Sequence, residues 1–208
     1  MKERNKKLIK RASVVAWFLE LLYWANTAAY FCWLLGVWYY SPDWHSGLFA
    51  VTEGVLISFG YPIQDISTAV PIFVVAMVNG MLVSGLMSLI FHNIRRIFDV
   101  STGVDWDSIA PTPFQPANVK LLRQVGFYAI AIPLVKFFSH WLAQIIHASE
   151  QIPEFNIITF FTTTIMFPHK LPIPSISLEE IFMGVAIFCL AQIFAYGVEL
   201  QTDVDGLL

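Results

Sequence analysis

A stripe of polar side chains runs through the otherwise apolar segment 119–149. Its members are separated by steps of three, four and seven residues, which places them on one face of a helix: Gly126, Pro133, Lys136, His140, Gln144 and His147. A charge at mid-bilayer costs about 2.5–3.5 kcal/mol, so we expect Lys136 to face the protein interior or water. Lys136, His140 and Gln144 then form either a path for an ion, proton or ligand, or the lining of a hydrated cavity toward which the lysine extends. We favour the second interpretation.

Glu20 is another ionisable residue within an apolar segment, and it shares a helical face with Trp24 and Thr27. Counted from the ends of the two segments, its depth differs from that of Lys136 by roughly 10 Å. We therefore expect its counter-charge to be Arg123 or the lysines near the N-terminus. A simply hydrated carboxylate at the membrane interface is an equally good interpretation.

Known catalytic and cofactor patterns are missing from the sequence. There is no phosphate-binding glycine loop, no nucleophile elbow and no HExxH motif. His92 has no histidine at its depth to share a haem, and His140 and His147 are seven residues apart, which disfavours a metal pair. Cys32 and Cys189 lie in apolar runs and indicate neither a disulfide framework nor a zinc site. We expect no enzymatic activity, no cofactor, no metal and no direct contact with nucleic acid.

The elements that position these residues are predicted to be membrane-spanning helices. The chain has 208 residues, of which 57% are hydrophobic and 13% charged, about half the charged fraction of a soluble domain. Four stretches are long enough to cross a bilayer: about 13–40, 71–92, 119–149 and 177–200. The sequence therefore predicts one all-α domain over residues 1–208, a four-helix transmembrane bundle.

Local signals support these helices. Pro116 suits the first turn of the third helix, and Ser177 with Glu180 forms a capping box at the start of the fourth. The second helix carries small residues every four positions, which predicts close packing against another helix: Ala76, Gly80, Ser84 and Ser88.

Lysine and arginine set the expected orientation. Six of the twelve precede the first span, and four lie near the connection between the second and third spans: Arg95, Arg96, Lys120 and Arg123. Because positive residues remain on the cytoplasmic side, both termini and residues 93–118 are predicted to be cytoplasmic. The basic N-terminal segment also suits contact with anionic lipids of the bilayer.

The two outer loops are rich in residues that favour strands, at Leu48–Gly60 and Phe155–Phe167. We expect them to pair into a small extracytoplasmic β element. An interfacial helix in the first loop is the alternative.

Two segments resemble the DUF2975 family of small bacterial membrane proteins. The first contains Phe114, Asn118, Leu122, Arg123 and Gly126; the second contains Ile193, Phe194, Gly197, Glu199, Leu200 and Asp205. The chain ends in Asp205-Gly206-Leu207-Leu208, where family members commonly end in a sequence like Asp-Leu-Thr-Val. The first half matches the family only in hydropathy.

The resemblance implies a multi-pass protein of the bacterial cytoplasmic membrane with no known activity. Members of that family often look paired with a small helix-turn-helix regulator. We therefore expect a non-enzymatic regulatory or partner-binding protein, with a small DNA-binding protein as candidate partner. The candidate cytoplasmic surface for it is Phe114, Asn118, Arg123, Glu199, Asp203 and Asp205. The alternative is a small transporter or channel subunit that uses Lys136, His140, Gln144 and Glu20. Whether the chain forms a homo-oligomer is left open.

Overall fold

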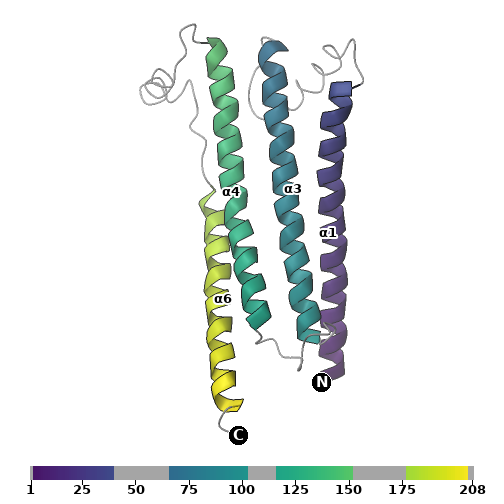
Figure 1. The fold of residues 1–208 in the computed structure, drawn as a ribbon, viewed down its shortest axis with the longest axis vertical. Helices are drawn as coiled ribbons and strands as arrows, with labels where there is room; N and C mark the ends of the chain where they lie inside the picture. Colours follow the sequence, from purple (N-terminus) through teal and green to yellow (C-terminus); the bar gives the residue numbers. More distant parts are fainter. Residues whose placement is uncertain (1, 40–65, 103–115, 152–176, 206–208) are drawn as a thin grey trace. The chain divides into compact units, whose positions relative to one another are not determined.

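The computed structural model describes residues 2–39, 66–102, 116–151 and 177–205, and every one of them except Ser177 is helical. The helices are α1 (Lys2–Tyr39), α3 (Ile66–Thr102), α4 (Pro116–Gln151) and α6 (Leu178–Asp205), drawn in Figure 1. This part of the chain contains no strand, which confirms the all-α prediction for it. The predicted β element at Leu48–Gly60 and Phe155–Phe167 lies outside the described residues.

Three helices are long and apolar enough to cross a membrane: Pro71–Asp99, Pro116–Ile146 and Leu178–Val204. The chain is therefore a membrane protein, as its composition predicts. α1 is long enough but less apolar, because Glu20, Asn26 and several tryptophans and tyrosines interrupt its aliphatic residues. A fourth crossing at 13–40, and with it the four-helix bundle, stays a prediction.

Two predicted helix starts are confirmed. α4 begins at Pro116, where a missing N–H leaves no hydrogen bond unmade. α6 begins directly after Ser177, whose Oγ accepts a hydrogen bond from the backbone N–H of Glu180 at 3.4 Å. Pro71 and Pro133 lie inside α3 and α4, and Pro133 is fully buried.

The helices contribute to two compact units. The first unit combines α1 up to Ala25, α3 from Ser84, α4 up to Pro133, and α6. Within it, α4 and α6 approach so closely that a Cβ on Gly184 would lie 3.1 Å from the Ile130 backbone nitrogen and 3.2 Å from the Gly126 oxygen. Two glycines thus let the backbones of these two helices come together.

The second unit combines the later part of α1, the earlier part of α3 and α4 from Leu134. Phe73 and Met77 of α3 are buried against Tyr30 and Leu34 of α1. Gly80 completes this contact, because a Cβ there would lie 2.7 Å from the Tyr30 ring. The predicted packing role of Gly80 is confirmed, and Ser84 and Ser88 further along the same row are buried as well.

Large apolar side chains are exposed along every helix, among them Phe18, Val78, Phe138 and Phe182. Soluble proteins rarely expose so much contiguous apolar surface. On helices of this length and hydropathy, such side chains are suited to lipid rather than water.

Candidate functional site

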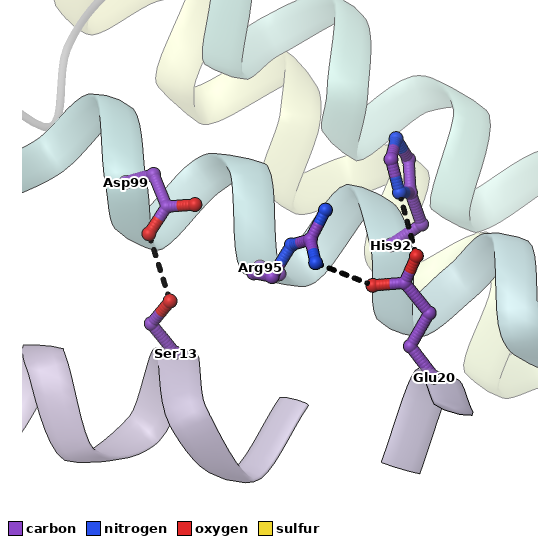
Figure 2. A network of polar contacts seen from close by, with 5 residues as sticks. All are labelled: Ser13, Glu20, His92, Arg95 and Asp99. Atoms are coloured by element: carbon purple, nitrogen blue, oxygen red, sulfur yellow. Dashed lines mark hydrogen bonds and ion pairs between the residues drawn. The ribbon is translucent and has the colours of Figure 1, made fainter. Parts of the chain in front are cut away.

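A buried carboxylate links α1 to α3 within the first unit. Glu20 Oε1 lies 2.9 Å from His92 Nδ1, and Glu20 Oε2 lies 3.2 Å from an Arg95 guanidinium nitrogen. The Glu20 side chain is 11% exposed, against 38% for His92 and 26% for Arg95. The Arg95 contact is ionic rather than a well-aligned hydrogen bond. Figure 2 shows both contacts side by side.

A second polar contact joins the same two helices. The Ser13 hydroxyl donates a hydrogen bond to Asp99 Oδ1 at 2.7 Å. Ser13 lies two turns before Glu20 on α1, and Asp99 lies two turns after His92 on α3, so the helices run antiparallel past each other. The rings of Tyr23 and Phe91, which also join α1 to α3, stack with their centroids 5.6 Å apart.

The prediction of which residues balance the charge of Glu20 is therefore wrong. Among the described side chains, His92 and Arg95 of α3 pair with it, and Arg123, Lys7 and Lys10 do not. The predicted partners of Glu20 were limited to Lys136, Arg123 and the N-terminal segment, which were compared by their depth from the helix ends. The missed signal was the three-residue spacing of His92 and Arg95, which places both on one face of α3.

The chemistry that this cluster supports is charge neutralisation. A carboxylate held by a guanidinium and an imidazole has its charge balanced inside an apolar helix pair. Among the described residues, no three His, Cys, Asp or Glu side chains converge to hold a metal ion.

The polar stripe of α4 is divided between the units: Gly126 and Pro133 lie in the first, and its members from Lys136 onward lie in the second. Lys136 and His140 are half-buried, Gln144 is buried, and all three interact with other residues. His140, Asn79 and Ser139 border a cavity of about 10 Å³, room for roughly one water. The Asn79 Oδ1 in this group is buried without a hydrogen-bond partner among the described residues. The His147 side chain lies outside them.

The proposed partner surface is smaller than the sequence suggested. Arg123, Glu199 and Asp203 are exposed, but Asn118 is fully buried and is not accessible to a partner. Asn118 is thus a core residue of the first unit, although it belongs to one of the quoted motifs. Phe114 and the Asp205 side chain lie outside the described residues.

A groove of about 770 Å³ runs between the start of α4 and the end of α6. It is lined by Pro116, Val119, Lys120, Arg123, Gln124, Phe127, Tyr128, Phe188, Ala195, Val198 and Glu199. Sequence reasoning found Arg123 and Glu199 but not the groove. The α4 residues of the lining recur at intervals of three and four from Pro116 and so share one helical face, but this spacing does not indicate that α6 lies beside that face.

No family model, curated protein or solved structure matches this chain. The DUF2975 resemblance therefore rests on its two motifs. The helical parts of both motifs lie on α4 and α6, the helices that form the groove.

Proposed function

We propose that this chain is a non-enzymatic, multi-pass protein of the bacterial cytoplasmic membrane that binds a small DNA-binding regulator at the end of α6. The observation that supports the proposal most directly is the acidic, exposed last turns of that helix. Glu199 and Asp203 are both exposed and are four residues apart, so they share one face.

The position of these carboxylates is unfavourable for the helix itself. The C-terminal end of a helix carries partial negative charge, which disfavours an acidic side chain in the last turn, such as Asp203, by about 0.3–1 kcal/mol. The last turn of α6 contains no basic residue, and neither carboxylate forms an ion pair within the described residues. Uncompensated negative charge suits a basic partner.

A DNA-binding protein carries a basic face for phosphates, so an acidic surface complements it. In the proposed topology the end of α6 is cytoplasmic, where such a regulator is found. The regulators that accompany the DUF2975 family suggest the same kind of partner. Binding would hold the regulator at the membrane and cover the face that it needs for DNA.

The alternative, a transporter built on Lys136, His140 and Gln144, gains less support. The cavity that borders His140 holds about 10 Å³ and admits no solute larger than water. The groove at the ends of α4 and α6 is far larger.

The test is a pull-down of the tagged full-length chain from native membranes, followed by identification of small DNA-binding proteins. The variant Glu199→Gln/Asp203→Asn is expected to lower the recovered regulator at least about tenfold, as two charge contacts of about 1 kcal/mol each imply. Glu179→Gln changes an exposed carboxylate at the opposite end of α6 and should leave recovery unchanged. Equal recovery with both variants, or a partner that lacks a DNA-binding domain, contradicts the proposal.

A further inference from the structure

The groove between α4 and α6 combines an apolar wall with unpaired positive charge. Phe127, Tyr128 and Phe188 supply aromatic surface, and Lys120 and Arg123 lie on the same α4 face. Both cations are exposed, and neither forms an ion pair with a described carboxylate. Glu199 is the acidic residue of the lining, so the groove carries one net positive charge.

Along α4 the cations come first and the aromatic side chains follow, in the same order as the phosphate and the acyl chains of a phospholipid. α4 begins a candidate membrane span at Pro116, and Lys120 and Arg123 lie in its first two turns. Phe127 lies two turns, or about 10 Å, beyond Lys120 toward the middle of the span. A phosphate at the level of the cations therefore directs attached acyl chains past the aromatic side chains.

The two helices are in close contact at one end of this arrangement. The close approach of Gly126 and Gly184 fixes the inner end of the groove, since a Cβ on Gly126 would lie 3.1 Å from the Phe188 ring. α6 continues past the start of α4 (Figure 1), and Glu199 is the last α6 residue of the lining. A volume of about 770 Å³ lies within the range of sites that enclose small ligands.

We propose that the α4/α6 groove is a binding site for an anionic phospholipid with a single phosphate, such as phosphatidylglycerol. The phosphate binds Lys120 and Arg123, and an acyl chain lies along Phe127 and Phe188. The net charge of the groove matches a singly charged headgroup, and the outlying Glu199 disfavours headgroups with further negative charge. Glu199 borders both this site and the proposed regulator surface, but lipid binding does not depend on the regulator-binding role of the α6 end.

The test uses the full-length protein in detergent, titrated with phosphatidylglycerol or phosphatidylcholine and followed by native mass spectrometry. Wild-type protein is expected to retain phosphatidylglycerol preferentially. Lys120→Gln/Arg123→Gln should weaken its binding about thirtyfold, as two basic residues near a lipid headgroup imply. The control Lys10→Gln/Arg96→Gln removes two exposed positive charges outside the groove and should change binding less than about twofold.

Two further variants test the groove and its charge separately. Ala195→Phe places a ring inside the groove and should lower retention, whereas Ala186→Phe, on exposed surface outside the groove, should not. Glu199→Gln should strengthen phosphatidylglycerol binding although it weakens regulator binding, so the two proposals can fail independently. Equal retention of both lipids, equal effects of the two double variants, or a protein recovered in the groove instead of lipid overturns the lipid site.

Discussion

At the scale of single residues, Glu20 shows how an ionisable group is accommodated in an apolar helix. Its two carboxylate oxygens are divided between an imidazole and a guanidinium on α3. The sequence indicated that Glu20 needs a partner, because an unpaired charge at that position is costly. It did not indicate which partner, because helical periodicity gives the face of each residue but not which helices adjoin.

Arg95→Met is expected to destabilise the fold by about 1–3 kcal/mol, because it leaves Glu20 with His92 alone. This range lies below that of fully buried pairs, since the Arg95 side chain is 26% exposed. Thermal unfolding in detergent measures the effect. Arg96→Met, at the exposed neighbouring position, should be within about 0.5 kcal/mol of wild type.

A double-mutant cycle that combines Arg95→Met with Glu20→Gln measures the interaction free energy between the two side chains. If the effects of Glu20→Gln and Arg95→Met simply add, the two side chains do not interact.

Gly80 and Gly85 form a matched pair of glycines on α3. An alanine Cβ at Gly80 would meet the Tyr30 ring at 2.7 Å, whereas at Gly85 nothing lies within 4 Å. Gly80→Ala should therefore cost about 1–3 kcal/mol by overpacking. Gly85→Ala should be neutral or stabilising by up to about 1 kcal/mol, because alanine favours helix. Unfolding midpoints in detergent that are lowered equally by both substitutions would contradict the packing of Gly80 against α1.

At the scale of helices, the sequence predicted position well and length poorly. The apolar stretch 71–92 lies inside an α3 that extends over Ile66–Thr102, and residues 13–39 of the stretch 13–40 lie within an α1 that begins at Lys2. Hydropathy marks the part of a helix that lipid surrounds, but backbone hydrogen bonds continue into water wherever no proline or glycine stops them. The boundaries that were marked by local chemistry, Pro116 and Ser177, were predicted to within a residue.

The α4–α6 pair depends on Gly184. Gly184→Val places a branched side chain against the backbone of α4 and should sharply lower the yield of monodisperse protein in size-exclusion chromatography. Ala186→Val introduces the same side chain on the exposed side of α6 and should leave the yield near wild type. Similar yields would show that α4 and α6 are not in close contact at this point.

At the scale of the whole molecule, membrane insertion follows from composition alone, but the site does not. Three apolar helices are visible in the sequence because hydropathy is a local average. The groove requires knowing that the start of α4 and the end of α6 are neighbours, and residues separated by about seventy positions carry no such information individually. Asn118 illustrates the same limit: a polar residue in a recognisable motif was assigned to a surface but is fully buried.

The orientation of the chain is tested with reporters. The concentration of ten of the twelve lysines and arginines on one side predicts that a fusion after Leu208 is cytoplasmic. A fusion within residues 155–170 should be extracytoplasmic. The pair of an alkaline phosphatase and a green fluorescent protein reporter gives opposite signals in the two compartments. Reversed signals, or both fusions on one side, would show that the number of crossings is odd or the orientation inverted.

The contact between Glu20 and His92 also sets a condition on how the chain is made. The two residues are 72 positions apart, so at about 5–20 residues per second the ribosome adds His92 roughly 4–15 seconds after Glu20. In the proposed topology α1 enters the bilayer during that interval with its carboxylate unsatisfied. α1 must then wait beside the translocation machinery, or at the membrane surface, until α3 arrives. Nascent chains halted before α3 has left the ribosome should therefore remain extractable from membranes, whereas chains halted after Asp99 has left it should resist extraction.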